Sequence, residues 1–375
     1  MGADVPGPLG SGVLRRRRRV QHRMSDENSS ESPEHAEVSA PWGSTEKQFP
    51  GGQFVVPAPA VVEPSSEPST DQVVEADRER NHVAELTEDE LDADPDEMSD
   101  ETAAAVRSTD EPPLSAERQV PPLPRIIAVA SQKGGVGKTT TSINLSAFLA
   151  ELGHRVLVVD LDPQGNATTG LGFDRQSLER DVYDVLLNDV PLFDAVEPTS
   201  VKGLFCVPSG TKLKDAELEL APAMAREMRL RTALAEVVDD FDYVLIDCPP
   251  SFSLLTKNGL VAANEVLIPV QCEYYALEGL AQLLEHVDEV RRYMNQTLEV
   301  STIVLVMYDG RTQLAKDVVS EVTQYFGEKV CRNKIPRTVK LAEAPSFGQP
   351  ISVHAPGSRG AVAYKELARE VSGVS

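Results

Sequence analysis

Two lysines, three glycines and three threonines stand close together in Lys133–Thr141, which reads Lys-Gly-Gly-Val-Gly-Lys-Thr-Thr-Thr. The glycines at 134, 135 and 137 leave the backbone without side chains, so its N–H groups can approach an anion closely. The lysine at 138 adds a positive charge, and the threonine at 139 adds a hydroxyl oxygen that can bind a divalent cation. A segment of this kind is typical of a loop that surrounds phosphate groups.

Two regular elements must flank this loop and hold it in place. Ile126–Ala130 is short, apolar and rich in β-branched residues, which is typical of a strand buried on both faces. Apolar residues after Lys138 predict a helix that ends at Gly153. In this order of strand, loop and helix, the loop N–H groups and the positive end of the helix dipole point at the same anion. We therefore predict a nucleotide site in which Lys138 and the backbone N–H groups of residues 134–139 bind phosphate, while Thr139 holds Mg²⁺.

The spacing of these residues separates two kinds of phosphate-binding loop. The common pattern G-x-x-x-x-G-K-[ST] requires glycine at position 132, where this chain has Gln132. The pattern that fits is K-G-G-x-G-K-[ST], with a second lysine, Lys133, at the start of the loop. It resembles the deviant Walker A motif of the ParA/MinD family of ATPases. That resemblance implies that Lys133 reaches across a dimer to the ATP of the partner subunit, as an arginine finger does.

Carboxylates end two further apolar segments that read as strands. Phe241–Asp247 is a Walker B pattern, in which Asp247 holds Mg²⁺, usually through a water molecule. Arg155–Asp160 runs into Asp-Leu-Asp-Pro-Gln-Gly-Asn, so that carboxylates stand where ligands bind in open α/β sheets. The alternative is that Asp160 and Asp162 only cap a turn. The segment resembles the switch region of ParA proteins, which implies that Asp162 orients the attacking water and that Asp160 lies near the metal and the loop lysine.

Strands and helices alternate through the rest of the chain, which predicts an α/β fold with a doubly wound, mostly parallel sheet, the fold of P-loop NTPases. Apolar residues at helical spacing, assigned to the core, are Leu280, Leu283, Leu284 and Val287. The remaining expected strands are Glu265–Val270, Ser301–Met307 and Lys329–Ile335. A helix through Phe326, a loop at Leu341–Gly348 and a terminal helix at Gly360–Val371 complete the expected ATPase domain, residues 124–375.

Residues 1–123 have a different composition, with few aromatic residues and many Pro, Ser, Glu and Asp. They carry 26 Asp/Glu against 11 Lys/Arg, whereas the rest of the chain carries 33 against 25, so most of the net charge of −23 lies here. Such a segment cannot bury enough apolar surface to offset its ordering entropy, so we predict a disordered extension with a short helix near Val83–Leu91. The five arginines at Arg15–Arg19 could touch nucleic acid or lie upstream of a second possible start at Met24.

Cysteine spacing and hydropathy narrow the class of protein. Cys206, Cys248, Cys272 and Cys331 form no C-x-x-C pair, which disfavours a zinc site and indicates buried, reduced cysteines. No apolar run approaches the roughly 18 residues that a membrane span needs. We therefore expect a cytoplasmic protein without stable membrane association.

The motifs together resemble the chromosomal, Soj-type ParA partition ATPases. The segments that carry the resemblance are Lys133–Thr140, Asp160–Asn166, Asp247–Ser251, Met307–Arg311 and Ile335–Gly348. It implies a homodimer that closes around two ATP molecules, binds DNA non-specifically and associates with the nucleoid. It also implies a ParB-type centromere-binding partner that stimulates hydrolysis and releases the dimer. The cargo, a chromosome or a plasmid, stays open.

The resemblance also assigns individual residues. Arg311 and Lys340 match positions that contact DNA in the family, although both could be ordinary surface charges. Pro336 matches the residue beside the adenine, and Thr338 stands where the family often has Asn. The complete set of predicted nucleotide-binding residues is Lys133, Gly134, Gly135, Val136, Gly137, Lys138, Thr139, Thr140 and Pro336. Lys133, Lys138 and Asp162 are the predicted catalytic residues, and Thr139 and Asp247 the predicted metal-binding residues.

Three alternative hypotheses fit the sequence less well. A MinD-like, membrane-associated positioning ATPase would need an amphipathic C-terminal helix with a basic face, but the end of this chain mixes both signs of charge. A relative of the nitrogenase iron protein would need cysteines to hold a cluster across a dimer, and Cys248 and Cys272 lack matching surroundings. A non-hydrolysing, ATP-gated scaffold would not need the carboxylate of Asp162.

Overall fold

The computed structural model describes residues 122–273 and 276–374, which contain a seven-stranded sheet. The strand order is β3-β4-β2-β5-β1-β6-β7, and all neighbours are parallel except β3 and β4. The strands are β1 (Arg125–Val129), β2 (Val156–Asp160), β3 (Glu197–Pro198), β4 (Leu204–Val207), β5 (Tyr243–Asp247), β6 (Glu265–Gln271) and β7 (Glu299–Val306).

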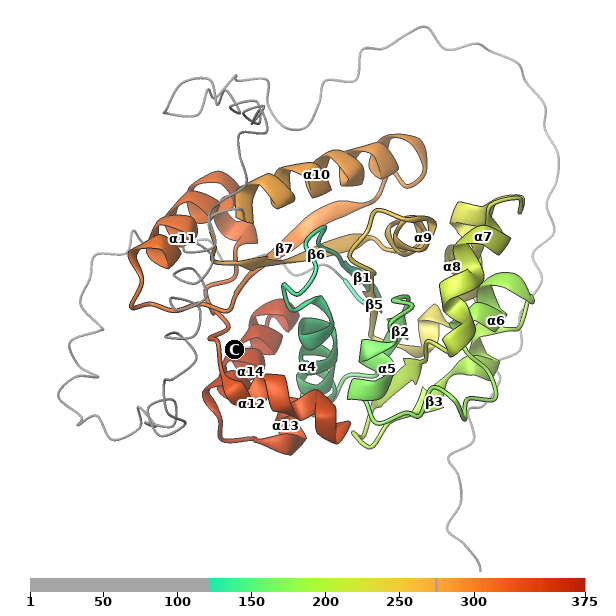
Figure 1. The fold of residues 1–375 in the computed structure, drawn as a ribbon, viewed down its shortest axis with the longest axis horizontal. Coiled ribbons are helices and arrows are strands. Elements are labelled where there is room, and N and C mark those ends of the chain that lie inside the picture. Colours follow the sequence, from blue (N-terminus) through green and yellow to red (C-terminus); the bar gives the residue numbers. More distant parts are fainter. Residues whose placement is uncertain (1–121, 274–275, 375) are drawn as a thin grey trace, which may run out of the picture. The chain divides into compact units, whose positions relative to one another are not determined.

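Helices cover both faces of this sheet (Figure 1). One layer contains α6 (Val182–Leu187), α7 (Ala216–Leu220), α8 (Arg229–Leu234), α9 (Leu254–Ala262), α10 (Ala276–Tyr293) and α11 (Gln313–Phe326). The other contains α4 (Lys138–Glu151), α5 (Asn166–Gly170), α12 (Val339–Glu343), α13 (Ile351–His354) and α14 (Arg359–Ser372). The fold is therefore the predicted doubly wound α/β sheet.

The strands are apolar on both faces because each face has its own core. In β1, Ala128 belongs to the core under α9 and α10, whereas Ile127 and Val129 belong to the core under α4 and α14. Successive side chains of a strand point to opposite faces, so a strand covered on both sides must be apolar throughout. This explains why unbroken apolar runs predicted these strands correctly.

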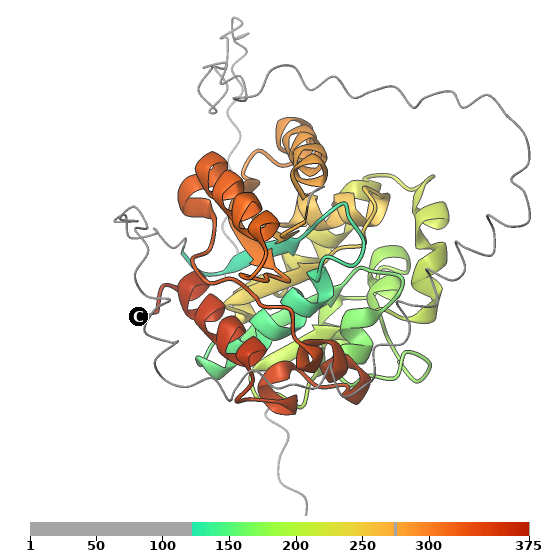
Figure 2. The same cartoon turned by 60° about the vertical axis from the view of Figure 1, so that its left-hand side comes forward.

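The helix that follows the glycine loop is buried by the C-terminal helices, beside which it lies in both views (Figures 1 and 2). Tyr364 of α14 contacts Thr141 of α4 through their hydroxyl groups, 3.1 Å apart. Asn144 of α4 accepts a hydrogen bond of 2.7 Å from the backbone N–H of Ile351, at the start of α13. The end of the chain thereby fixes the helix that presents the loop.

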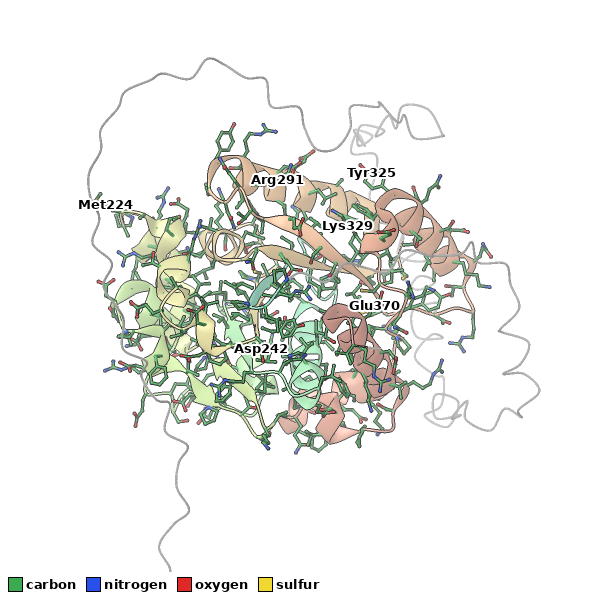
Figure 3. The ribbon with its side chains drawn as sticks, turned by 180° about the vertical axis from the view of Figure 1, so that it is seen from behind. Met224, Asp242, Arg291, Tyr325, Lys329 and Glu370 are labelled. Atoms are coloured by element: carbon green, nitrogen blue, oxygen red, sulfur yellow. The ribbon has the colours of Figure 1, made fainter. Side chains whose placement is uncertain are left out.

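Two predicted elements were wrong. Lys329–Ile335 forms no strand in the described structure; only isolated parallel bridges join Val330 and Pro336 to the β7 region. The reason is Glu370 of α14, labelled in Figure 3, whose carboxylate accepts the backbone N–H groups of Arg332 (2.9 Å) and Asn333 (3.4 Å). These two N–H groups therefore donate to Glu370 and not to a neighbouring strand.

The predicted loop at 341–348 is instead the end of α12 followed by a 3₁₀ turn, Ala344–Phe347. Thr338 causes the difference, because its hydroxyl accepts the backbone N–H of Leu341 and caps α12.

The predicted disorder of residues 1–123, the short helix near Val83–Leu91 and the role of Arg15–Arg19 fall on residues that, apart from 122 and 123, lie outside the described chain. The domain boundary at 123/124 stays a prediction. All four cysteines are buried, as expected. Within the described residues, no helix is both long enough and apolar enough to span a bilayer.

Candidate nucleotide site

The glycine loop connects the carboxyl end of β1 to the first residue of α4. Gly135 and Gly137 adopt φ angles of 74° and 87°, in the left-handed region that side chains disfavour, and Gly137 caps α4. Gly134 has no such angle, and a Cβ atom built there would meet no protein atom within 4 Å. Packing within the chain therefore does not explain this glycine, whereas close approach of a phosphate to the loop backbone does.

Lys138 is bound tightly into this loop although it carries a charge. Only 6% of the residue is exposed, and its Nζ donates to the carbonyl of Lys133 at 3.4 Å. Burial lowers the pKa of the Lys138 ammonium group, and the carboxylates of Asp247 and Asp162 oppose this effect. The positive charge is thus fixed where the loop backbone and two acidic side chains converge. Of the other predicted contacts, Val136 is buried, and the carbonyl of Thr140 accepts a hydrogen bond from Asn144.

Asp247 and Thr139 form a pair that fits a magnesium ion. Thr139 Oγ1 donates to Asp247 Oδ2 at 2.8 Å, and Ser142 Oγ donates to Asp247 Oδ1 at 2.8 Å. Burial raises the pKa of Asp247, as does the nearby carboxylate of Asp160, its register partner on β2. Hydroxyl and carboxylate oxygens are the ligands that Mg²⁺ prefers, and a cation here would offset the buried negative charge. The donor set therefore fits the predicted metal.

Asp162 follows β2 and lies beside this pair. It is 6% exposed; its Oδ1 accepts the N–H of Gln164 at 2.9 Å, and its carbonyl accepts Ser209 Oγ at 2.8 Å. Its carboxylate is one of the two that stabilise the charge on Lys138. Asp162 therefore belongs to the same site as the glycine loop. Its bond to the N–H of Gln164 also caps the turn after β2, as the alternative hypothesis expected.

Asp160 lies beside Asp247, its register partner on β5, and is held by hydrogen bonds from the segment that follows it. Its carboxylate is fully buried and accepts three hydrogen bonds from its own loop, from the N–H of Asp162 (3.1 Å) and from the N–H (2.8 Å) and Oγ1 (2.6 Å) of Thr168. Burial raises the pKa of Asp160 and these bonds partly offset that effect. Asp160 thus organises the β2–α5 connection, and its negative charge raises the pKa of Asp247, which belongs to the predicted metal pair. Its place near the metal and Lys138 stays a prediction.

Lys133 points away from the loop that it begins. Its Nζ lies 3.4 Å from Oε1 of Gln271, the last residue of β6, and 2.8 Å from Oε2 of Glu273, just beyond that strand. The side chain is 44% exposed. Its charge is therefore held at the surface, in contrast to the buried charge of Lys138.

The three remaining predicted residues lie in the segment that follows β7. Pro336 forms a bridge with Tyr308, and it is half-buried. Arg311 is 91% exposed and binds Asp309 through Nε at 3.0 Å and through Nη2 at 3.0 Å. Lys340 is 58% exposed and lies 3.1 Å from Glu343. Arg311 and Lys340 thus share exposure to solvent, and neither joins the glycine loop.

Several residues of the site were missed from the sequence. They are Ser142, Thr168, Ser209 and Glu273. Ser142 could have been found, because it follows Thr139 by three residues and so lies on the same helix face. Thr168 stands in α5, eight residues after Asp160, so it too lies near in the sequence. Ser209 and Glu273 reach the site through segments that come together only in the folded chain, and no local signal marks these two.

Comparison with known proteins agrees with this geometry. Residues 124–300 match a protein family described as an AAA domain. The sporulation initiation inhibitor protein Soj of Bacillus subtilis is 52% identical over 248 residues, which are 66% of this chain and 98% of that protein. The chromosome partitioning protein ParA of Myxococcus xanthus is 49% identical over 247 residues, 66% of this chain and 87% of that one.

Solved structures share the fold. A cobyrinic acid a,c-diamide synthase of Mycobacterium smegmatis, bound to ADP and magnesium, has a TM-score of 0.57 and 41% identity over 65% of this chain and 92% of its own. The cell division ATPase MinD of Pyrococcus furiosus has a TM-score of 0.56 and 27% identity, over 67% of this chain and 99% of its own. The first of these structures contains the two ligands for which the glycine loop and the Thr139–Asp247 pair are suited.

Proposed function

This chain belongs to the Soj/ParA family of chromosome-partitioning ATPases, and on this basis we propose that it couples ATP hydrolysis to reversible DNA binding. It is an ATP hydrolase whose cofactors are ATP and Mg²⁺. In the proposed cycle, two ATP-bound copies form a dimer that binds nucleoid DNA without sequence preference. A ParB-type centromere-binding protein then stimulates hydrolysis and releases the dimer, which moves a chromosome or a plasmid.

The position of Lys133 is the observation that supports the dimer. Its ammonium group is exposed and held only at the surface, by Glu273 and Gln271, while Lys138 supplies the charge inside the loop. An exposed ion pair is weak, because water solvates both partners well. Lys133 can therefore leave Glu273 at little cost and place its charge on the phosphates of a facing subunit, as an arginine finger does in trans.

The side chains of one subunit have separate tasks in hydrolysis. Lys138 and the loop N–H groups bind the phosphates and offset their charge. Thr139 and Asp247 would hold Mg²⁺, which when bound would supply further positive charge at the phosphates. Asp162 orients a water molecule toward the γ-phosphorus. The water oxygen forms the new bond to that phosphorus while the bond to the bridging oxygen breaks, and the water gives up a proton to solvent, which leaves ADP and inorganic phosphate.

The proposed DNA contacts are Arg311 and Lys340. Both are exposed, and each is paired with a carboxylate of its own segment, Asp309 or Glu343. Such surface pairs are weak, so DNA phosphates can replace the carboxylates. Phosphate contacts carry no sequence information, which suits binding along a whole nucleoid.

Replacing both Arg311 and Lys340 with alanine should weaken DNA retention without changing nucleotide affinity. Each lost phosphate contact should reduce the slope of log affinity against log salt by about 1. We would measure retention on DNA over a salt series and nucleotide binding in parallel. Lys202→Ala is the matched control, because this exposed lysine lies before β4, at the other edge of the sheet. Unchanged retention in low salt would place the DNA-binding surface elsewhere.

The MinD-like alternative requires a C-terminal helix whose apolar side is free to bind lipid. In α14 that side is buried, with Tyr364, Leu367 and Val371 nearly inaccessible to solvent. The helix would have to leave α4 in order to bind a membrane. This burial favours DNA over a membrane as the surface on which the dimer assembles.

The test of the proposed function uses the full chain. Its ATPase rate should be low alone and should rise several-fold only when DNA and the cognate ParB-type protein are both present. ATP with magnesium, but not ADP, should retain the protein on DNA of unrelated sequences. Equal rates under all conditions, together with no ATP-dependent retention, would reject the proposal.

A further inference from the structure

Arg175, in the segment between α5 and α6, joins the two loops that meet beside Asp162. Its guanidinium donates to four backbone carbonyls. Nη1 binds Gln164 O at 2.6 Å and Nη2 binds Pro163 O at 2.7 Å, both in the loop after Asp162. Nε binds Ser209 O at 2.8 Å and Nη2 also binds Gly210 O at 3.0 Å, both in the loop after β4.

The backbone of the first loop is shaped around this guanidinium. Gly165 has a φ angle of 65°, and a Cβ atom placed on it would lie 2.1 Å from Arg175 Nε. A side chain at position 165 would therefore displace Arg175. The glycine both permits the turn after Asp162 and leaves the space that the guanidinium fills.

The second loop is bonded to the catalytic segment by a further set of contacts. Ser209 Oγ donates to the carbonyl of Asp162, and the N–H of Ser209 donates to Thr168 Oγ1, each at 2.8 Å. Thr168 in turn donates to Asp160. Arg175 thus completes a connected network of hydrogen bonds. This network fixes Asp162 and the loop after β4 that packs against it.

We propose that Arg175 is a positioning residue for ATP hydrolysis, which holds the Asp162 loop in the conformation that orients the attacking water. This inference depends on the role proposed above for Asp162. A guanidinium is a rigid, planar group with five donors, so it can bind four carbonyls in fixed directions. A lysine in its place would offer a single ammonium group on a flexible stem and could not hold both loops. Because a misplacement of about 1 Å can cost about 10²-fold in rate, loss of this group should act on turnover.

The test compares Arg175→Ala and Arg175→Lys with the wild-type full chain. Both variants should lower kcat by about 10²-fold, while the affinity for an ATP analogue and the Tm stay close to the wild-type values. Guanidinium ion at millimolar concentration should restore part of the activity of Arg175→Ala alone. Arg229→Ala is the matched control, because Arg229 pairs with the exposed Asp189 at the surface of α8. A kcat like that of the wild type, or a loss that follows a fall in Tm and in nucleotide affinity, would overturn the proposal.

A double variant separates this inference from the proposed function. If Arg175 acts through Asp162, then Arg175→Ala should cause no further loss of turnover in an Asp162→Ala background. A further loss as large as in the wild-type background would show that Arg175 acts independently of Asp162. If Asp162→Ala alone turns over ATP normally, the role of Asp162 is wrong and the inference falls with it. If Asp162→Ala is slow but Arg175→Ala is normal, only the inference about Arg175 is wrong.

Discussion

Lys133→Ala should abolish the ATP-dependent dimer while leaving ATP binding measurable. Lys138 and the loop backbone remain in place to bind the phosphates of the same subunit, whereas the charge supplied to the partner subunit is lost. A missing finger residue costs about 10³–10⁵-fold in turnover in related phosphoryl-transfer sites, so hydrolysis should fall by at least the lower figure. Sedimentation with a non-hydrolysable ATP analogue and magnesium measures the dimer, and equilibrium titration measures nucleotide affinity.

The fold should tolerate this substitution. Lys133 is half-exposed and its pair with Glu273 is a surface ion pair, so the free energy of unfolding should change by less than about 1 kcal/mol. Lys202→Ala serves as the control for loss of an exposed lysine outside the loop. If Lys133→Ala still dimerised with normal affinity, the assignment of Lys133 to the partner's site would be wrong. The proposed cycle of ATP-dependent dimerisation would then lack its supporting observation.

The parts of the site that could be predicted from the sequence are those whose chemistry is local. The loop at 133–139 needs glycine for its φ angles and for close approach of a phosphate. It also needs a lysine and a threonine at fixed positions, so a few neighbouring residues suffice to predict it. Asp247 could be placed beside it because parallel strands of one sheet end at the same edge. The fold class followed from apolar strands covered on both faces.

Other features depend on contacts between distant segments and could not be predicted. The segment 329–335 has the composition of a strand, but Glu370, nearly 40 residues later, binds its backbone N–H groups. Lys133 and Glu273 are 140 residues apart and meet only because β1 and β6 are neighbours in the sheet. β4 was not predicted, and β3 is only two residues long.

One wrongly predicted element, the loop at 341–348, carries a local signal for the helix that forms instead. Thr338 was interpreted only as a departure from an adenine-binding position, although a threonine three residues before Leu341 is also a helix-capping signal. A polar side chain compared only with a binding position thus had a structural partner nearby.

Asp162→Ala should produce a long-lived ATP-bound dimer on DNA. Lys133, Lys138, Thr139 and Asp247 stay in place to bind phosphate, metal and the partner's ATP, whereas the carboxylate that orients the attacking water is lost. Loss of a residue that orients or activates the nucleophile costs about 10²–10⁴-fold in rate, so dissociation that depends on hydrolysis should slow by a similar factor. The measurement is the rate at which protein leaves DNA after ATP is withdrawn, together with the ATPase rate.

Asp162 also has a structural contact, which a second variant separates from its catalytic role. Its Oδ1 accepts the N–H of Gln164 at 2.9 Å, so alanine removes a turn-forming acceptor together with the carboxylate. Asp162→Asn keeps an oxygen that can accept this bond but removes the negative charge. If the charge orients the water, both variants should be slow and both should accumulate on DNA. If only the alanine variant is slow, Asp162 acts through the turn alone, and if neither is slow, another residue orients the water.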